Sequence, residues 1–386
     1  MPSIVVTSPD KEPTKPVATT LEQLREAVST YPICLVTGGA GYIGSHTVLE
    51  LLTAGFAVVV VDNLCNSHLE SLYRVHYIAR IETYPMLEYS IDTGKRTKLS
   101  PLCSVADSFG KIVCVIHFAA LKAVGESLSM PLDYYEVNVA GLLFVLKAMR
   151  AHAVNTFVFS SSAVVYGMGH GAGIAEDAVR TAGQGSGGGL LTNPYGRSKW
   201  MSEEIINDFC AAHPRFHATS LRYFNPTGAH ASGLIGENPK GTPNNIVPVI
   251  LQAYERRRSR VQVFGSSYDT SDGTGVRDYI HVSDLAKGHL AALRKAVTTE
   301  PPATQYNVYN LGTGRGYSVL EIIKAFSMAA GTEVPYSIGE ARQGDLGTVT
   351  ASPDKAATEL DWTAEFDLQD MCRDVYNWAS TNPGGY

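Results

Sequence analysis

The sequence predicts an α/β protein in which a doubly wound parallel sheet is followed by a smaller α/β domain. From residue 33, short β-branched runs alternate with stretches of helical period, and strand–helix–strand repeats build parallel sheets with right-handed crossovers. The runs are apolar almost throughout, as expected for strands covered by helices on both faces. With 386 residues, the chain is long enough for a second domain.

The elements are expected in a regular order. Strands are predicted where the β-branched runs lie, over 33–37, 57–61, 113–117, 156–160 and 217–222. Helices are predicted where apolar residues recur at helical spacing, over 42–54, 69–80, 132–151 and 195–211. After about residue 226 the alternation loosens into turn-rich segments, with a last helix over 368–378. These later pieces predict the smaller domain.

Composition argues against several kinds of function. The formal net charge of −6 argues against a general binder of nucleic acids or anionic membranes. No apolar stretch reaches the roughly 18 residues of a membrane span. The six cysteines are scattered without a C-x-x-C pair, so we expect no disulfide framework, no metal site and a reducing cytoplasm.

A glycine-rich turn follows the first predicted strand and opens the first predicted helix. The glycines at 38, 41 and 44 allow a close backbone approach to a pyrophosphate, which the N–H groups at the helix start would bind. Asp62 follows the next predicted strand, where a carboxylate accepts the ribose hydroxyls of NAD and repels the 2′-phosphate of NADP. The pattern predicts a Rossmann-type domain that binds NAD. The residues expected on the cofactor here are Gly38, Gly41, Tyr42, Ile43, Gly44, Asp62, Asn63, Asn66 and Ser67.

Hydroxyl and amine groups follow further along the predicted sheet. Ser160 and Ser162 close a predicted strand, at the sheet edge where open α/β folds bind ligands. Tyr195 and Lys199 lie four residues apart at the start of a predicted helix, so they share one helical face. A tyrosine with an ordinary pKa of about 10 is a poor base at neutral pH. An adjacent ammonium and a positive nicotinamide would lower the pKa of Tyr195, which makes the pair a candidate general base and its activating lysine.

These motifs carry a family resemblance. The glycine turn, the strand-end serine and Tyr195-x-x-x-Lys199 resemble the extended short-chain dehydrogenase/reductase superfamily. Three further stretches, 117–127, 222–233 and 272–282, resemble the UDP-glucose (UDP-galactose) 4-epimerase family. The resemblance extends from about residue 33 to the C-terminus.

The resemblance implies a reversible 4-epimerisation of UDP-galactose and UDP-glucose through a transient 4-keto sugar and tightly bound NAD. Tyr195 would take the proton of the sugar 4-hydroxyl, Ser162 would hydrogen-bond the 4-oxygen, and Lys199 would tune Tyr195 and hold the nicotinamide ribose. Further residues implied on the cofactor side are Phe118, Ala119, Lys122, Asn138, Ser160 and Tyr223. Those implied on the UDP-sugar side are Lys122, Asn225, Asn244, Asn245, Phe264, Arg277, Tyr279, Arg342, Asp345 and Val349.

Two positions depart from the usual pattern of this family. Val164 stands where these epimerases usually carry Thr, which removes one hydroxyl near the sugar. Val349 stands where the family places a residue beside the sugar 2-position. A bulky Tyr there suits plain hexoses, whereas small residues admit N-acetyl groups, so we expect activity on UDP-N-acetylhexosamines as well as on UDP-hexoses.

The same residues bear on alternative activities. Sugar-nucleotide 4,6-dehydratases need an extra acid and base after the strand-end hydroxyl, which Ser162, Ala163 and Val164 do not supply. A UDP-glucuronate-modifying enzyme or another UDP-sugar 4-epimerase stays open. A non-catalytic sensor of NAD or UDP-sugar is the alternative from a different class, and the presence of both Tyr195 and Lys199 argues against it.

The expected organisation follows from these motifs. Residues 1–32 form an N-terminal extension that we expect to be flexible, and 33–225 form the NAD-binding domain, with a Gly-rich insertion at 183–189. Residues 226–386 form the UDP-sugar-binding domain, and parts of 275–312 return to the first domain. Because relatives use helices corresponding to 132–151 and 195–211 for a two-fold dimer, the resemblance also implies a homodimer.

Overall fold

The structure, a computed structural model, describes residues 4–5, 31–79, 87–90, 112–167, 171–178, 191–241, 243, 245–298, 305–342 and 345–386. The Gly-rich insertion, Asn244 and nearly all of the N-terminal extension lie outside these residues. The chain divides into two compact units. Unit 1 comprises Met1–Ser161, Asn193–Leu221 and His289–Val308, and unit 2 comprises Ser162–Thr192, Arg222–Gly288 and Tyr309–Tyr386.

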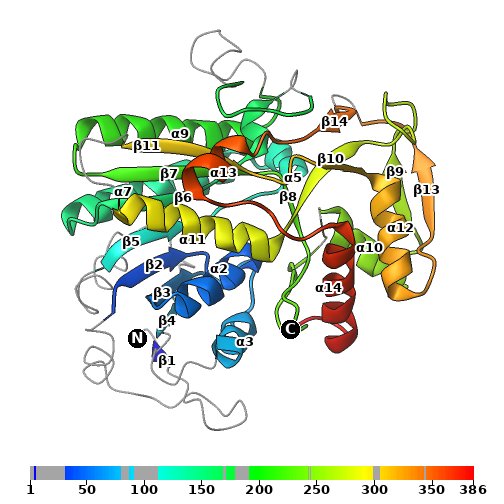
Figure 1. Ribbon diagram of the computed structural model, residues 1–386, viewed down its shortest axis with the longest axis horizontal. Coiled ribbons are helices and arrows are strands. Elements are labelled where there is room, and N and C mark those ends of the chain that lie inside the picture. Colours follow the sequence, from blue (N-terminus) through cyan, green and yellow to red (C-terminus); the bar gives the residue numbers. More distant parts are fainter. Residues whose placement is uncertain are drawn as a thin grey trace. The chain divides into compact units, whose positions relative to one another are not determined.

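A largely parallel sheet forms the centre of unit 1 (Figure 1). In the described part of the chain its strands follow the order β1-β4-β3-β2-β5-β6-β7-β11. The pairs β2–β3, β2–β5, β3–β4 and β5–β6 are parallel, which confirms the predicted fold class. The strand bounds are Ile4–Val5 (β1), Ile33–Thr37 (β2), Ala57–Asp62 (β3), Leu87–Ser90 (β4), Ile112–His117 (β5), Thr156–Ser162 (β6), His217–Tyr223 (β7) and Tyr306–Leu311 (β11).

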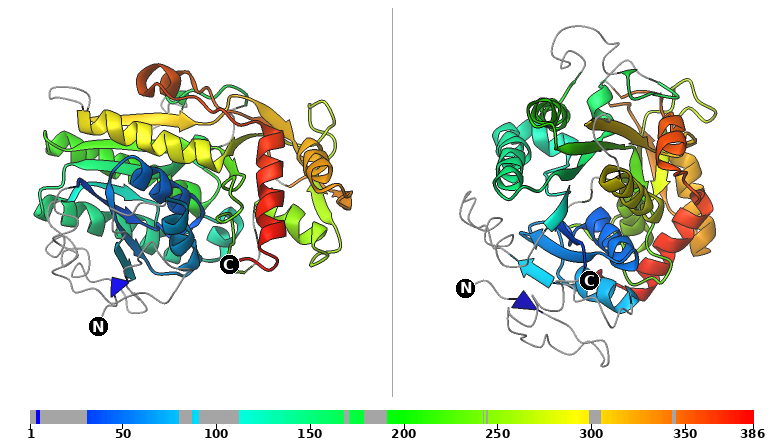
Figure 2. Two further views of the ribbon diagram at one scale, coloured as in Figure 1. Left: turned by 60° about the horizontal axis from the view of Figure 1, so that its bottom comes forward. Right: turned by 60° about the vertical axis from the view of Figure 1, so that its left-hand side comes forward.

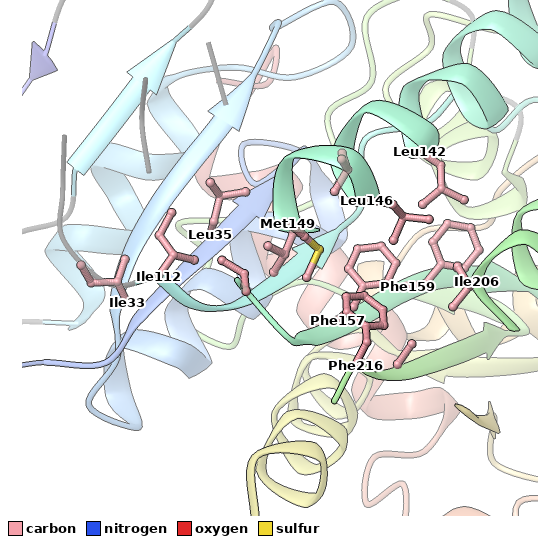
Figure 3. Packing of buried hydrophobic residues seen from close by; sticks show 14 of the residues in the cluster. Ile33, Leu35, Ile112, Leu142, Leu146, Met149, Phe157, Phe159, Ile206 and Phe216 are labelled. Atoms are coloured by element: carbon pink, nitrogen blue, oxygen red, sulfur yellow. The ribbon is translucent and has the colours of Figure 1, made fainter. Parts of the chain in front are cut away.

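Helices cover both faces of this sheet. Figure 2 shows α2 (Tyr42–Thr53) and α3 (Glu70–Ala79) on one face, and α7 (Gly141–Ala151) and α9 (Pro194–Ala212) on the other. Beneath α7 and α9 lies an apolar cluster, drawn in Figure 3. Each large apolar side chain buried there contributes about 1.5–3 kcal/mol. Its members include Leu142, Leu146, Met149, Phe157, Phe159, Ile206 and Phe216.

The helix predicted over 132–151 is wrong in one respect, because it is divided into three segments. α6 (Pro131–Tyr134) continues into the π-helical turn η1 (Tyr135–Ala140), and α7 follows. A π-helical turn bonds each N–H to the carbonyl five residues back while its backbone stays near helical dihedral angles; Ala140, for example, has φ −65° and ψ −37°. Hydrophobic periodicity therefore carried no sign of it. The short helix α5 (Val124–Ser129) precedes these segments.

Unit 2 is a second α/β assembly. Its β10 pairs antiparallel with β12 and parallel with β8 and β14, and β9 pairs parallel with β13. Helices α10, α12 and α14 bury a common apolar core against these strands, and α12 packs beside α14 (Figure 1). The strand bounds are Asn225–Thr227 (β8), Val261–Phe264 (β9), Val276–His281 (β10), Gly316–Ser318 (β12), Tyr336–Gly339 (β13) and Thr348–Val349 (β14). The helix bounds are Ala163–Tyr166 (η2), Ile246–Tyr254 (α10), Val282–Thr298 (α11, which ends in unit 1), Val319–Ala330 (α12), Asp354–Leu360 (α13) and Leu368–Thr381 (α14).

Candidate active site

The glycine turn between β2 and α2 leaves no room for side chains at two of its positions. Gly38 has φ +72°, and a Cβ there would lie 2.7 Å from the backbone nitrogen of Ala119. A Cβ at Gly44 would lie 2.3 Å from the carbonyl oxygen of Gly38. Gly41 caps α2 and donates its N–H to the same carbonyl at 3.2 Å. The turn thus brings bare backbone to the N-terminus of α2, which suits an anion such as a pyrophosphate.

Asp62, the last residue of β3, holds the glycine turn to the loop that follows. Its Oδ2 accepts a hydrogen bond from the backbone N–H of Ala40 at 3.0 Å. Its Oδ1 accepts from the N–H of Leu64 and from Ser67 Oγ, each at 2.8 Å. The carboxylate therefore has a structural task besides the ribose contact expected from the sequence.

The other predicted residues of this region lie on the same loop or on the strand beside it. Asn63 and Asn66 are exposed, whereas Ser67 is buried. Phe118, directly after β5, donates its N–H to the Thr37 carbonyl, and its ring centroid lies 4.9 Å from that of His289.

Tyr195 and Lys199 lie in the first turns of α9, which begins where the pattern predicted. Asn193 caps this helix, since its Oδ1 accepts from the N–H of Gly196 at 2.8 Å. Both predicted residues are buried, with exposed fractions of 9% for Tyr195 and 3% for Lys199. A buried phenol and a buried amine one turn apart suit a general base whose pKa a neighbouring cation lowers.

Strand β6 holds the Lys199 amine. Its Nζ donates to the Ser160 carbonyl at 2.6 Å and lies 4.8 Å from the centroid of the Phe159 ring. Burial lowers the pKa of Lys199 to about 7, and the nearby Glu203 raises it. Burial and then Lys199 lower the pKa of His117, on β5, to about 3. The His117 ring is therefore neutral at neutral pH, whereas Lys199 titrates there.

Asn138, in η1, holds the segment that carries Lys122. Its Oδ1 accepts from the N–H of Leu121 at 2.8 Å, and its Nδ2 lies 3.0 Å from the Leu121 carbonyl and 2.9 Å from Ser198 Oγ. The Asn138 side chain thus links the segment at Leu121 to Ser198 on α9. Lys122 itself is exposed.

Tyr134 contacts the candidate base Tyr195, a contact that sequence reasoning missed. Its hydroxyl contacts the backbone N–H and carbonyl of Ala123 and, at 2.8 Å, the carboxylate of Glu126. Its ring meets the Tyr195 ring edge-on, with centroids 6.3 Å apart. Burial, followed by the Glu126 hydrogen bond, raises the pKa of Tyr134, so it stays a phenol. No motif marks this residue, because its partners Ala123 and Glu126 belong to the short helix α5 and its N-cap, which the sequence pattern did not predict.

Unit 2 carries the remaining predicted residues. Ser162 ends β6, and its Oγ accepts from the N–H of Val164 at 3.3 Å. Tyr223 is buried at the end of β7. Asn225 and Tyr279 face each other as register partners of β8 and β10, and burial raises the pKa of Tyr279 to about 12.

The predicted acceptors and donors for a UDP group form pairs within unit 2. Arg277 donates to Asp345 Oδ1 at 2.6 Å, and Val349 is the register partner of Arg277 in the neighbouring strand β14. The Arg342 guanidinium lies 3.9 Å from the centroid of the exposed Phe264 ring.

Asn245 has a different neighbourhood from these pairs. It caps α10 and donates from Nδ2 to Glu237 Oε1 at 2.9 Å.

Within the described ranges, no group of His, Cys, Asp and Glu side chains could hold a metal ion. None of the helices there has the length and apolar character needed to cross a bilayer.

Comparison with known proteins agrees with these motifs. The model of the NAD dependent epimerase/dehydratase family matches residues 34–312. The UDP-glucose 4-epimerase of Dictyostelium discoideum is 49% identical over 353 residues, which cover 91% of this chain and 97% of the relative. That of Homo sapiens is 48% identical over 359 residues, with the same two shares.

A solved structure shows the same architecture. The UDP-glucose 4-epimerase from Bifidobacterium longum, in complex with NAD⁺ and UDP, has a TM-score of 0.80 at 44% identity, over 92% of this chain and 100% of that one. The chain therefore belongs to the NAD dependent epimerase/dehydratase family and, within it, to the group of UDP-glucose 4-epimerases.

Proposed function

We propose that the protein interconverts UDP-galactose and UDP-glucose at C4 of the sugar, with tightly bound NAD as cofactor. The proposal rests above all on the buried pair Tyr195 and Lys199, in a chain that matches UDP-glucose 4-epimerases over 91% of its length. Bound NAD supplies a reversible hydride acceptor. The protein supplies binding, orientation and proton transfer.

The residues of unit 1 fit NAD. At Gly38 and Gly44 the backbone lies where any Cβ would collide with it, beside the helix N-terminus that suits a pyrophosphate. Asp62 places a carboxylate at the end of the next strand, the position from which such folds bind a ribose. We therefore assign NAD binding to unit 1 and UDP-sugar binding to unit 2.

We assign the proton transfer to Tyr195. Its phenolate takes the proton of the sugar 4-hydroxyl and later returns it to the 4-oxygen. The Lys199 ammonium, held by the Ser160 carbonyl, stabilises that phenolate electrostatically. Ser162 donates a hydrogen bond to the 4-oxygen.

The UDP group is assigned to the paired residues of unit 2. The guanidinium groups of Arg277 and Arg342 suit the diphosphate because each presents several N–H donors in one plane. Asp345 is assigned to the ribose hydroxyls, and its bond to Arg277 holds both side chains in place. Val349 lies beside Arg277 in the sheet, and its small side chain supports activity on UDP-N-acetylhexosamines.

We also propose that the protein is a homodimer. Apolar side chains are exposed on the segments from α5 to α7 and on α9, and a contiguous exposed apolar surface commonly marks a protein interface. These side chains are Val124, Leu128, Met130, Leu132, Val137, Leu143 and Met201, with exposed fractions from 38% to 79%.

The cytoplasm is the proposed compartment. Cys34 and Cys114 are register partners on β2 and β5 and are both free thiols. Adjacent unpaired thiols suit a reducing environment.

An assay that couples UDP-glucose formation to a readout tests the activity. With UDP-galactose as substrate we expect turnover by the wild-type protein, and none by Tyr195→Phe, whose UDP affinity should stay near wild type. Tyr77→Phe is the matched control, since this exposed tyrosine of α3 should leave turnover unchanged. Near-normal activity of Tyr195→Phe would contradict the proton-transfer role. Binding of NAD and UDP-sugar without turnover would favour the sensor.

A substrate panel tests the specificity. UDP-hexoses, UDP-N-acetylhexosamines, UDP-pentoses and UDP-glucuronate are compared by kcat/KM. Val349→Tyr should lower kcat/KM for UDP-N-acetylgalactosamine by at least about tenfold, equivalent to roughly 1.4 kcal/mol, with little effect on UDP-galactose. No detectable conversion of any UDP-N-acetylhexosamine by the wild-type protein would overturn this part of the proposal.

A further inference from the structure

Unit 1 contains a buried serine–carboxylate pair that the proposed mechanism does not use. Ser161 and Glu203 have exposed fractions of 1% and 2%, and Ser161 Oγ donates to Glu203 Oε1 at 2.5 Å. A glutamate this deeply buried is uncommon, because removing a carboxylate from water is costly unless it is paired. A nearby positive charge would therefore stabilise the buried Glu203 carboxylate.

Lys199 provides this charge. Glu203 follows it by four residues on α9, so both side chains lie on one face of the helix. Consecutive residues of β6 hold the two groups, since the Ser160 carbonyl accepts from the Lys199 amine and the Ser161 hydroxyl donates to the Glu203 carboxylate. Consecutive residues of β6 thus hold a buried cation and a buried anion that are one turn apart on α9.

Apart from the Tyr195 phenolate of the proposed mechanism, His117, Tyr134 and the contacts from β6 bring no negative charge to Lys199. His117, on β5, is neutral because burial and Lys199 lower its pKa to about 3. Tyr134, on α6, stays a phenol and holds the Glu126 carboxylate of α5 through its hydroxyl. From β6 come the ring of Phe159 and the carbonyl of Ser160. Of the described acidic groups, Glu203 is the one that raises the pKa of Lys199.

We propose that Glu203 is a positioning residue that keeps Lys199 in its ammonium form, with Ser161 orienting the carboxylate, and that it acts on proton transfer only through Lys199. This inference rests on the proposed function of Tyr195 and Lys199. Glu203 itself is not assigned any contact with the sugar or with NAD.

The sign of the effect follows from the balance at Lys199. Burial has already lowered the pKa of Lys199 to about 7. Without the Glu203 charge this pKa falls further, and the amine loses its proton at a lower pH. The Tyr195 phenolate then loses its neighbouring cation, so the pH range in which the pair is active becomes narrower on its alkaline side.

Glu203→Gln tests the inference, because it keeps an acceptor oxygen for the Ser161 hydroxyl and replaces the charged carboxylate with a neutral amide of nearly the same size. We expect kcat on UDP-galactose to fall about 10- to 100-fold at neutral pH, the equivalent of one to two pKa units. The alkaline limb of the pH–rate profile should move to lower pH, while KM stays near wild type. Glu204→Gln, at the exposed next position of α9, is the matched control and should keep the wild-type profile.

A double-variant cycle separates this role from a merely structural one. In a Lys199→Met background, Glu203→Gln should lower kcat no further, because a residue that acts through Lys199 has nothing left to act on. The inference is overturned if Glu203→Gln keeps the wild-type profile, lowers kcat equally at all pH values, or retains its full effect without Lys199.

Two further measurements keep the result decisive. The pKa of Tyr195 can be measured without turnover from the tyrosinate absorbance as a function of pH. For each variant, the absorbance of the same variant carrying Tyr195→Phe is subtracted. The pKa of Tyr195 should be higher in Glu203→Gln than in the wild-type protein. This measurement can be made even if the wild-type protein does not epimerise UDP-galactose. That failure would overturn the proposed function but not the inference about Glu203. If Glu203→Gln loses NAD or fails to fold, Ser161→Ala takes its place and should shift the alkaline limb in the same direction by a smaller amount. An unshifted limb would then overturn the inference.

Discussion

Single residues at the glycine turn show how little space the fold allows around the proposed cofactor. At Gly44 a Cβ would meet the Gly38 carbonyl oxygen at 2.3 Å, a contact with backbone that no side-chain rotation can relieve. The same carbonyl accepts the Gly41 N–H that closes the turn. The backbone itself, and not the surrounding side chains, therefore excludes a side chain at Gly44.

Gly44→Ala should displace this turn. We expect the free energy of unfolding to fall by about 1–3 kcal/mol, the usual cost of forcing extra atoms into a packed site, and bound NAD to be lost. Urea unfolding and the NAD content of the purified protein measure both effects. Gly125→Ala is the control, because a Cβ there meets nothing within 4 Å. Retention of full NAD occupancy by Gly44→Ala would contradict this account of the turn.

At the scale of elements, side chains from one segment hold the backbone of another. The loop after β5 is held by Asn138 of η1 and by Tyr134 of α6, which bond the backbone of Leu121 and Ala123. Two residues from consecutive helical segments therefore set the path of the segment that carries Lys122.

Tyr134→Phe should loosen this loop. The change removes the hydroxyl that bonds the half-buried backbone of Ala123, and a fully buried polar group left unsatisfied would cost about 1–3 kcal/mol. We expect a loss of stability up to this size by urea unfolding and faster hydrogen exchange of the amides around Ala123. Tyr135→Phe, at the next position along the chain, should show neither change. Equal exchange rates in the Tyr134→Phe and wild-type proteins would refute the prediction.

In unit 2, α14 is tied to β10 through a buried acid. His281 Nε2 lies 3.3 Å from Asp374 Oδ2, and Arg373 Nε donates to Asp374 Oδ1 at 3.0 Å. Although burial alone would raise the pKa of Asp374, the neighbouring His281 and Arg373 lower it on balance.

Asp374→Asn should therefore destabilise the protein in a pH-dependent way. Because the pKa of Asp374 is lowered in the folded state, its ionised form adds stability above the unfolded-state value of about 3.9, and this stability is lost as pH falls through the folded value. We expect wild type to exceed the variant in thermal stability at pH 6 to 8 and the difference to shrink below about pH 4. A difference that does not change between neutral and acidic pH would rule out the charge as its cause.

At the scale of the whole molecule, the exposed apolar side chains from α5 to α7 and on α9 are the feature that a single chain does not account for. Leu132 alone is 79% exposed. Leu132→Asp should reduce the mass measured by analytical ultracentrifugation from that of a dimer to that of one chain, because a charge in an apolar interface is costly to bury. Met328→Asp is the control: this side chain of α12 is 70% exposed and lies outside these segments, so the change should leave the assembly as it is. A wild-type protein that sediments as a monomer would overturn the dimer.

Much of unit 1 could be predicted because its signals are local. The strand at Ile33–Thr37 and the start of α9 agree closely with their patterns, since β-branched runs and helical periodicity act over a few residues. The positions of Gly38, Gly44 and Asp62 follow from the same short-range rules. The roles of individual residues in binding and catalysis stay predictions until the variants above are measured.

By itself, the sequence determined the fold class, the phosphate turn, the Tyr195–Lys199 spacing and the family, because each depends on neighbours in the chain or on whole motifs. Only the tertiary structure decided which distant groups meet. It showed the π-helical turn that carries Asn138, the bond between Arg277 and Asp345 across 68 residues, and the pairing of Ser161 with Glu203 across 42. Such contacts depend on how strands and helices are placed in space, and hydrophobic periodicity carries no information about that placement.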